Sequence, residues 1–525
     1  MKKATVEPSC TGQFSQLFLD YLAQKPELKP FYSFFPSLEN FSSLIQQKNF
    51  SQDKRDVLAD VLHRQYQGIA TSELTLSQIE SLRSKKTFTV ITGHQLNLFT
   101  GPLYFIYKIV TTINLAEQLK KAYPEYHFVP VYWLASEDHD FDEINYFKLD
   151  GKKYQWNSDQ TGSVGDFQLD ETFKNFFKTV SHFAPEFFKD AYLGSQTLAE
   201  AGRKYVHHLF GEKGLLIVDG KEASLRSFFH KVIVDDLTNH TAYQKSTEQT
   251  AKLETLGYKS QIFPREINFF YTDKGLRERI EQVEDFYHVL NTDLKFTQEE
   301  ILRVVAESPE KFSPNVVLRP LYQEMILPNL AYIGGPAEMV YWLQLKTVFD
   351  HFEEAFPAVM PRNFAAVLDA KIIKKKEKLG LSEADLFQSV IDWKKQYILN
   401  HAQTDIFLEK ERAELKTIFE QARDTAVTLD QTLHASFEAA RVRALKIMDQ
   451  MSTKLRKAEE RKHAQEIRMR EDIAAHMYPG GTPQERLENF LKFYLGDDTF
   501  IEQLFDTFDP LDFKFIVLSQ DGDEG

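Results

Sequence analysis

The sequence predicts an α/β fold in which a parallel sheet is followed by a long helical arm. The strand-like run 88–92, the helical spacing of apolar residues from Leu103 to Leu119 and the strand-like run 128–134 form one βαβ unit. Two strands joined through a helix pair in parallel, so a parallel sheet is the simplest arrangement. Residues 381–478 contain no Gly and no Pro, a composition that indicates long helices.

The other segments follow in chain order around this unit. Residues 1–86 are expected to form short helices, broken at prolines, that cap the sheet. The first insertion should contain helices at 172–181 and 198–210, and the apolar run 214–219 returns to the sheet. The second insertion should contain a helix at about 241–256, a short strand-like stretch at 260–273, and then charged helices that end near Ser308. The predicted divisions are 1–150 (helical cap and first half of the core), 151–210 (first connecting insertion), 211–240 (core strand and helix), 241–312 (second connecting insertion), 313–380 (second half of the core), 381–478 (coiled-coil arm) and 479–525 (terminal helix and strand).

Heptad spacing predicts a coiled coil in the arm. Apolar residues seven positions apart mark the first seam: Leu408, Leu415, Ala422 and Leu429. A second seam runs through 444–458, and a turn is expected near 428–432, so the two seams predict an antiparallel hairpin. Such an arm commonly forms a homodimer; a simple pair of surface helices is the alternative. After Pro479-Gly480-Gly481, Thr482 and Glu485 are expected to form a capping box.

Two polar loops follow the predicted strands at their carboxyl ends, where an open α/β sheet binds its ligands. The loop GHQLNLFTGP offers polar groups beside a helix N-terminus, a suitable place for a phosphate or carboxylate: Gly93, His94, Gln95 and Asn97. The loop ASEDHDFDEIN is crowded with acids and one histidine: Glu137, Asp138, His139, Asp140, Asp142 and Glu143. Carboxylates this close repel one another unless a cation, an amine or a metal lies among them. A solvated acidic turn that caps the following helix is the alternative.

Residues 313–370 contain a second set of polar side chains near a similar turn. Gly334-Gly335-Pro336 has a proline at the start of a helix predicted over 337–352. The candidates that could face a pocket are Arg319, Gln323, Glu324, Glu338, Tyr341 and Arg362. Arginine can hold a carboxylate or phosphate through two parallel hydrogen bonds. Each residue also has an ordinary alternative: a first-turn acid, a surface charge or a core aromatic.

Composition excludes several classes of protein. The net charge of −14 argues against broad binding to nucleic acid, and the single cysteine, Cys10, excludes an intramolecular disulfide. The uncharged stretch 87–107 approaches the length of a membrane span, but His94, Gln95 and Asn97 lie in its middle, where lipid would penalise them. The start has no apolar segment of the kind found in signal peptides. We therefore expect a cytoplasmic protein without a membrane or nucleic-acid partner.

Five segments carry a resemblance to one known family: TGHQLNLFTGPLYFIYK (92–108), PVYWLASEDHDFDEIN (130–145), PNVVLRPLYQEMILPNLAYIGGPAEMVYWLQLK (314–346), MPRNF (360–364) and YPGGTPQER (478–486). The chain resembles the cysteine-adding enzyme family of bacillithiol biosynthesis, abbreviated BshC, over nearly its whole length. The family often has two glutamines after the first Thr-Gly, where this chain has His94-Gln95.

The resemblance implies a Rossmann-like parallel-sheet core with two inserted connecting segments and a C-terminal antiparallel coiled coil that forms a homodimer. It also implies the last step of bacillithiol synthesis, in which L-cysteine is joined through an amide bond to the glucosamine nitrogen of glucosaminyl-malate. A free carboxylate must first be activated, most simply by ATP, so ATP or ADP is the expected cofactor. The sequence has no GxxxxGK[ST] loop, and whether a metal is needed is left open.

Site residues are assigned from their place in these motifs. The catalytic candidates are Glu137, Asp138 and His139. The substrate-binding candidates are Gly93, His94, Gln95, Asn97, Lys108, Trp133, Asp140, Arg319, Gln323, Tyr332, Gly334, Gly335, Glu338, Tyr341 and Arg362. The nucleotide-binding candidates are Tyr478, Glu485 and Arg486, and no metal ligand is assigned. Two other functions stay open: a non-catalytic dimeric scaffold that binds the substrate, or a metal-dependent amide hydrolase.

Overall fold

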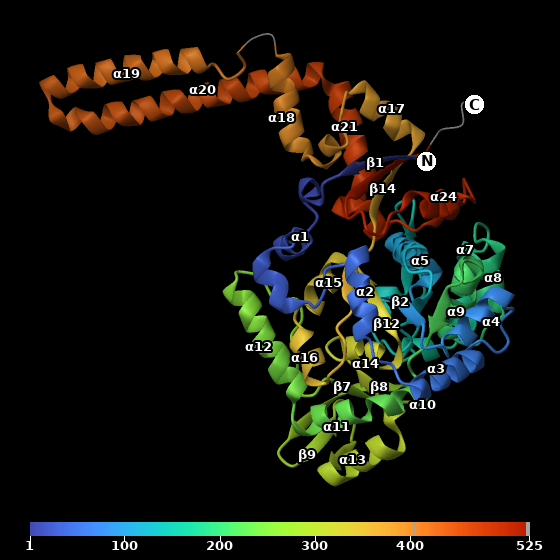
Figure 1. Cartoon of the computed structure of the whole chain (residues 1–525). Helices are drawn as coiled ribbons and strands as arrows, with labels where there is room; N and C mark the ends of the chain where they lie inside the picture. The colour runs from blue at the N-terminus through green and yellow to red at the C-terminus, as the bar shows by residue number, and fades with distance from the viewer. Residues whose placement is uncertain (403–404, 521–525) are drawn as a thin grey trace. The chain divides into compact units, whose positions relative to one another are not determined.

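The computed structural model describes residues 1–402 and 405–520, which divide into two compact units (Figure 1). The pocket unit consists of 5–366 and 482–516, and the coiled-coil unit consists of 1–4, 367–481 and the chain from 517 onward. Residues 403–404 of the predicted arm and 521–525 of the predicted terminal segment lie outside the described part.

A five-stranded parallel sheet forms the core of the pocket unit, with the order β13-β12-β2-β3-β6. Its strands are β2 (Thr87–His94), β3 (His127–Leu134), β6 (Leu216–Val218), β12 (Asn329–Gly334) and β13 (Ala358–Pro361). In chain order these strands are arranged 3-2-1-4-5, the order of a Rossmann sheet, and the direction of winding reverses between β2 and β12. The Rossmann-like parallel sheet is therefore confirmed.

The first βαβ unit has the predicted composition. Helix α5 (Tyr104–Ala122) joins β2 to β3, and β2 is buried along almost its whole length, as expected of a central parallel strand. The core combines apolar residues of β2, α5, β3, β12 and β13, among them Val90, Leu115, Leu119, Ile333 and Met360. At the end of α5, Lys120 donates hydrogen bonds to the carbonyls of Pro124 and Tyr126, just beyond the last turn of the helix.

Short helices precede and interrupt the sheet. The N-terminal helices each begin after a serine whose side chain accepts a backbone N–H: α1 (Gln16–Leu22), α2 (Leu38–Gln47), α3 (Gln52–Gln65) and α4 (Glu73–Ser81). The first insertion contains the hairpin β4 (Tyr146–Leu149) and β5 (Lys152–Gln155) with α7 (Glu171–Val180), α8 (Glu186–Leu193) and α9 (Leu198–Phe210). Its two predicted helices are thus confirmed. After β6 come α10 (Ala223–Arg226) and α11 (His230–Thr238).

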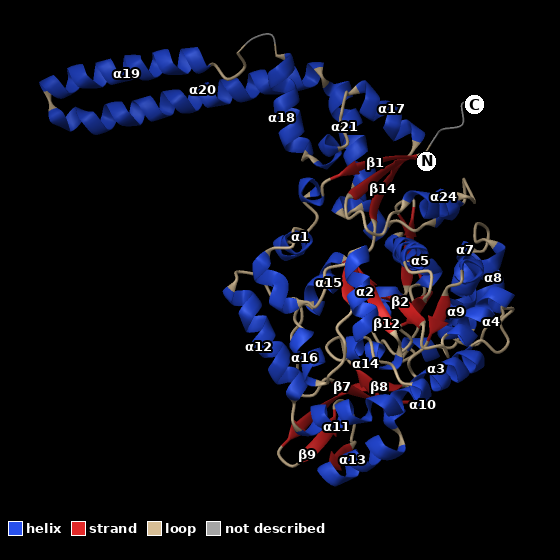
Figure 2. Cartoon of the chain, in the orientation of Figure 1, coloured by secondary structure: helices blue, strands red, loops and turns tan. Residues whose placement is uncertain are grey.

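The second insertion begins as predicted, with a helix and then a strand, but the prediction of charged helices after the stretch 260–273 was wrong. After α12 (Thr241–Thr255), the chain forms an antiparallel sheet: β7 (Phe269–Asp273), β8 (Leu276–Val283), β9 (Phe286–Val289), β10 (Lys295–Thr297) and β11 (Phe312–Pro314). The one α-helix of that stretch is α13 (Gln298–Glu307), which a single 3-10 turn (Pro309–Lys311) follows, and α13 lies beside the sheet (Figure 2). Strand β8 carries charged residues on both faces and buries Arg277 with Ile280, so the period of two that marks a strand is hidden in its sequence.

The helix predicted over 337–352 is broken. The segment that follows α14 (Arg319–Ile326) and β12 forms α15 (Pro336–Trp342) and α16 (Lys346–His351). Between them, the buried Gln344 side chain accepts the N–H groups of Gln261 and Ile262 from the second insertion. These hydrogen bonds to a distant segment compensate for the backbone hydrogen bonds lost where the helix is interrupted. Helix propensity alone does not predict them.

The coiled-coil unit contains the predicted antiparallel hairpin, formed by α19 (Glu409–Leu429) and α20 (His434–Lys462) with a turn at 430–433. Figure 1 shows the two helices side by side, and ion pairs Arg412–Asp449 and Arg423–Glu438 join them. The predicted first seam is wrong at its ends, because Leu408 precedes α19 and Leu429 is 84% exposed. The other helices of the unit are α17 (Ala370–Lys378), α18 (Val390–His401) and α21 (Ala464–Met477).

A second, three-stranded sheet joins both ends of the chain in the order β1-β15-β14. It consists of β1 (Lys2–Val6), which the sequence did not predict, β14 (Phe364–Leu368) and β15 (Phe515–Ser519). The capping box predicted at Thr482 and Glu485 was wrong: α22 (Gln484–Leu487) begins after Pro483 without a side-chain cap. Two short helices follow, α23 (Leu491–Tyr494) and α24 (Phe500–Thr507). Within the described residues, no helix combines the length and apolar character that crossing a membrane requires.

Candidate active site

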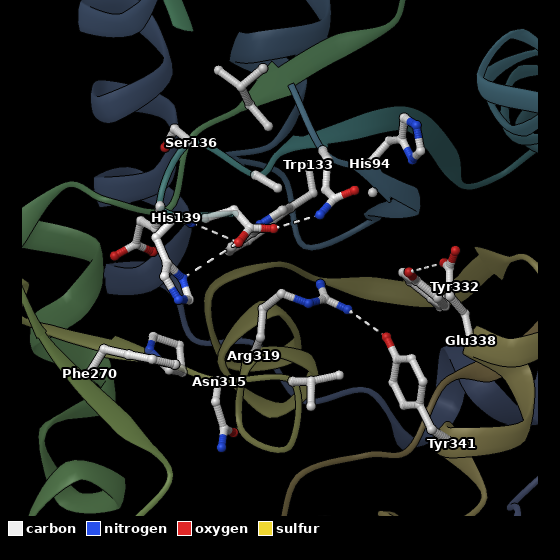
Figure 3. A pocket seen from close by; sticks show the side chains of 18 of the residues that line it. His94, Trp133, Ser136, His139, Phe270, Asn315, Arg319, Tyr332, Glu338 and Tyr341 are labelled. Atoms are coloured by element: carbon white, nitrogen blue, oxygen red, sulfur yellow. Dashed lines mark hydrogen bonds and ion pairs between the residues drawn. The ribbon is translucent and has the colours of Figure 1, made fainter. Parts of the chain in front are cut away.

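A cavity of about 520 Å³ lies at the carboxyl ends of β2, β3 and β12, where the winding of the sheet reverses (Figure 3). This is the place where Rossmann sheets bind ligands, and the volume suits a small molecule. The predicted residues that line it are Gly93, His94, Gln95, Lys108, Trp133, Glu137, Asp138, His139, Arg319, Tyr332, Glu338 and Tyr341. Segments from three distant parts of the sequence therefore meet at one site.

The first polar loop is attached to the acidic loop by Gln95. Its Nε2 donates to Oδ2 of Asp138 and to Oε2 of Glu143, each at 2.8 Å. Beside it, the Nε2 atom of His94 is buried and forms no hydrogen bond to any described residue. Burial, reinforced by the nearby charge of Lys108, lowers the pKa of His94 to about 3. His94 is therefore neutral near pH 7 and does not contribute a positive charge to the cavity.

Lys108, Glu338 and Tyr332 form a bonded group at the base of the cavity. Lys108 Nζ, on the buried face of α5, donates to the carbonyl of Gly93 at 2.9 Å and to Oε1 of Glu338 at 2.6 Å. The Tyr332 hydroxyl donates to the other Glu338 oxygen at 2.6 Å. Burial tends to raise the pKa of Glu338, but Lys108 and the Tyr332 hydroxyl hold it below its usual value. Glu338 is thus an ionised carboxylate at the start of α15, with both oxygens occupied.

One acid of the acidic loop, Glu137, is paired with an arginine from a distant segment. Arg226 of α10, which has no exposed surface, places Nη2 at 2.6 Å from both carboxylate oxygens of Glu137. Asp138 Oδ1 accepts the backbone N–H groups of His139 and Asp140, which turns the loop back on itself. For Glu137, the cation that the sequence analysis expected among these acids is therefore a protein side chain.

His139 is held by Arg277 of the inserted sheet. Arg277 Nη1 lies 2.5 Å from Nδ1 of His139, and its guanidinium group stacks 3.9 Å from the centre of the Phe270 ring. A guanidinium group can only donate hydrogen bonds, so Nδ1 of His139 is the acceptor and the neutral ring carries its proton on Nε2. Burial and the charge of Arg277 both lower the pKa of His139, in agreement with a neutral ring.

Arg277 and Arg319 present positive charge to the cavity without a bonded carboxylate. Within the described residues, Arg277 bonds to His139 and to the Ser313 hydroxyl. Arg319 bonds to the Gln323 amide oxygen at 3.1 Å and to the Tyr341 hydroxyl at 3.4 Å. Because their partners are neutral, both guanidinium groups keep the capacity to bind an anionic group of a ligand.

Several predicted residues lie outside the cavity lining. Gly334 and Gly335 form the turn behind it, and Asp140 and the buried Gln323 stand beside lining residues. The Asn97 side chain packs on Gly101, and the Asn97 backbone carbonyl accepts a hydrogen bond from the Tyr205 hydroxyl. Arg362 forms a buried ion pair with Glu485, at 2.6 and 2.9 Å, instead of facing the cavity.

Two of the three nucleotide-binding candidates, Glu485 and Arg486, line one hollow of about 160 Å³, which is separate from the cavity and small for a nucleotide. Glu485 is also paired with Arg362. Tyr478 belongs to the coiled-coil unit. The use of ATP and the role of these residues stay predictions. Among the residues that the structure describes, no group of three or more His, Cys, Asp or Glu side chains is placed to hold a metal ion.

Some site residues carried no usable signal in the sequence. The cavity is also lined by Tyr104, Ser136, Phe270, Arg277, Pro314, Asn315 and Val316, and Arg226 supports it from behind. Ser136 lies inside the second predicted loop and Tyr104 in the first turn of the helix predicted after the first loop, so both could have been included. Arg226 and Arg277 come from segments predicted as ordinary helix, where a single arginine is unremarkable.

Comparison with known proteins identifies the family. The model of the bacillithiol biosynthesis BshC N-terminal Rossmann-like domain matches residues 1–363, and that of the BshC C-terminal coiled-coil domain matches 365–520. A Flavobacterium psychrophilum protein named "Putative cysteine ligase BshC" is 42% identical, with 97% of this chain and 98% of the relative covered. Proteins of the same name from Cytophaga hutchinsonii (42% identical, 96% of each chain) and Christiangramia forsetii (41%, 97% of each) are also similar. The chain belongs to the BshC family of bacillithiol biosynthesis.

Proposed function

We propose that this protein is a cysteine ligase that joins the carboxyl group of L-cysteine to the glucosamine amine of glucosaminyl-malate through an amide bond. The names of its relatives support a ligase that acts on cysteine. The observation that carries the proposal is the composition of the cavity. Arg277 and Arg319 can bind carboxylates of the substrate, while the carboxylate of Asp138 lies on the same cavity wall as His139.

The reaction forms a C–N bond at the activated carboxyl carbon of cysteine, breaks the bond from that carbon to the oxygen that carries the activating phosphate group, which leaves with it, and releases one proton from the attacking amine. ATP would supply the activation that a free carboxylate needs. Among the acidic residues, Asp138 is the best acceptor for the proton, because within the described part of the chain its Oδ2 is engaged only by the amide of Gln95. Glu137 is less suitable, since its two oxygens are bound to Arg226. His139 accepts from Arg277 at Nδ1 and directs an N–H at the substrate, which suits it for orientation.

The loop offers a matched pair of variants for the test. Asp138→Asn should lower kcat by about 100-fold or more, the usual contribution of a positioned base. Asp142→Asn, four residues away, exposed and outside the cavity lining, should keep activity near that of the wild type. The assay combines L-cysteine, glucosaminyl-malate and ATP, and the amide product is detected by mass spectrometry.

The same reaction must also operate in cells. Deletion of the gene should abolish bacillithiol and cause glucosaminyl-malate to accumulate, and only the active variants should restore the thiol. Unchanged bacillithiol in the deletion strain would overturn the proposal. Saturable binding of glucosaminyl-malate without turnover would instead indicate a scaffold, and amide cleavage that needs no ATP but stops with a chelator would indicate a hydrolase.

We also propose that the α19–α20 hairpin forms a homodimer. The proposal is supported by apolar side chains that the hairpin leaves exposed within one chain, including Ile418 (59%), Ile447 (54%) and Met451 (51%).

A further inference from the structure

A buried chain of polar groups extends behind Arg319, away from the cavity. Arg319 Nη1 donates to Oε1 of Gln323 at 3.1 Å, and Nε2 of Gln323 donates to Oε1 of Glu324 at 2.9 Å. The same Glu324 oxygen accepts Nδ2 of Asn329 at 2.7 Å. Gln323 and Glu324 have no exposed surface, and neither lines the cavity. Buried polar groups of this kind are costly unless every member is satisfied.

The chemistry of the two ends determines how the Gln323 amide is oriented. A guanidinium group only donates hydrogen bonds, so the atom of Gln323 that faces Arg319 must be the oxygen. The Glu324 oxygen on the other side already accepts from Asn329, and it therefore requires the NH₂ group of Gln323. This orientation presents a fixed acceptor to Arg319. The reverse orientation would place an NH₂ group against a cation.

Glu324 is itself anchored from the opposite side. Lys48 Nζ, with 2% of its side chain exposed, lies 3.6 Å from Oε2 of Glu324 and donates to the Glu324 backbone carbonyl at 2.9 Å. Lys48 also pairs with Oε1 of Glu354 at 2.8 Å. Burial raises the pKa of Glu324, against the opposing effect of Lys48. Even a proton on Oε2, which has no hydrogen-bond partner among the described residues, would leave Oε1 free to accept from Gln323.

We infer that Glu324 is a positioning residue, which acts through Gln323 to hold the Arg319 guanidinium group toward the cavity for a carboxylate of the substrate. The identity of that substrate rests on the proposed function, whereas the geometry of the chain does not. Glu324 touches no ligand, so its effect should appear in the binding of carboxylates and should require Arg319.

Glu324→Met tests this relay. The methionine offers no acceptor to the NH₂ group of Gln323, so the contact that orients Gln323 is lost and the oxygen that it presents to Arg319 is no longer held in place. We expect the Kd of L-malate, measured by calorimetry on the full chain, to rise about tenfold, the scale of one hydrogen bond to a charged group. Glu354→Met is the matched control, since Glu354 also pairs with Lys48 but does not contact Gln323; its Kd should stay within twofold of the wild type.

A double-mutant cycle with Arg319→Gln separates the relay from a general structural effect. Glu324→Met should add little to the loss caused by Arg319→Gln, because both disturb one interaction. Equal effects of Glu324→Met with and without Arg319, or an equal effect of Glu354→Met, would overturn the inference. If Glu324→Met does not fold, Gln323→Met replaces it in the same cycle. Equal affinity of the wild type and of Arg319→Gln for malate would also overturn the inference. A failure of the proposed ligase function would look different: the coupling between positions 324 and 319 would be intact, but no amide would form.

Discussion

The ion pair with Arg226 gives Glu137 a structural role in the acidic loop, whereas we propose a catalytic role for its neighbour Asp138. Arg226 is completely buried, bonds to both oxygens of Glu137, donates to the Phe312 carbonyl at 2.9 Å and stacks 4.3 Å from the centre of the Tyr322 ring. In Glu137→Gln, the arginine keeps its charge but loses its only bonded carboxylate among the described residues. We therefore expect a large loss of stability in the pocket unit.

The magnitude follows from the burial of the pair. Removing one partner of a buried ion pair typically costs about 3–5 kcal/mol. The Glu137 side chain is 15% exposed, and Arg226 retains its carbonyl and aromatic partners, so the loss should lie near the lower value, about 3 kcal/mol. Replacing both partners, as in Glu137→Leu/Arg226→Met, should recover part of this loss, because no unpaired charge is then buried.

Urea-induced unfolding followed by tryptophan fluorescence measures this change, since Trp133, Trp156 and Trp342 all lie in the pocket unit. Asp142→Asn, at an exposed acid of the same loop, is the control and should change the free energy of unfolding by less than about 0.5 kcal/mol. Equal stability of Glu137→Gln and wild type would refute the reasoning. So would a double variant less stable than either single variant.

Two further predictions concern the first polar loop. Between pH 6.5 and about 3 the unfolded chain binds a proton at His94 that the folded chain excludes, so the stability associated with this residue is present above pH 6.5 and is lost as the pH falls. His94→Gln should remove this dependence, a difference of about 2 kcal/mol at pH 5 in denaturant titrations run at several pH values; identical pH profiles would contradict it. Asn489, buried in the C-terminal segment, donates to the carbonyls of Phe99 and Gly101 and supports the positive φ angles of Phe99 (52°) and Thr100 (70°). Asn489→Ala should cost about 2 kcal/mol and raise the KM for glucosaminyl-malate, and an unchanged KM would show that the loop keeps its shape without this support.

The main features of the core could be predicted because their signals are local. The alternation between strand-like and helical spacing identified β2, α5 and β3, and the absence of Gly and Pro with heptad spacing identified the coiled-coil hairpin. The residues of the site were predicted from the position of their loops relative to the strands. A polar loop at the carboxyl end of a parallel strand lies at the edge where ligands bind, so His94, Asp138 and Glu338 were found without knowledge of their partners.

The second insertion shows where local signals fail. Strand β8 has charged residues on both faces, and its stability comes from pairing with β7 and β9, so its sequence resembles that of a solvated helix. The same segment supplies Arg277, whose role depends on a contact with His139, 138 residues away. No spacing rule connects two residues that meet only after the insertion has folded.

The sequence by itself determined the type of the core, the position of the ligand-binding edge and the concentration of acidic groups on it. The tertiary structure alone decided how those groups are charged and oriented. Glu137 is committed to the buried Arg226, His139 keeps its proton on Nε2 because Arg277 occupies Nδ1, and Arg319 is held by Gln323. The physical reason is that pKa values and hydrogen-bond directions depend on burial and on the nearest charges, and both arise from segments that are far apart in the chain.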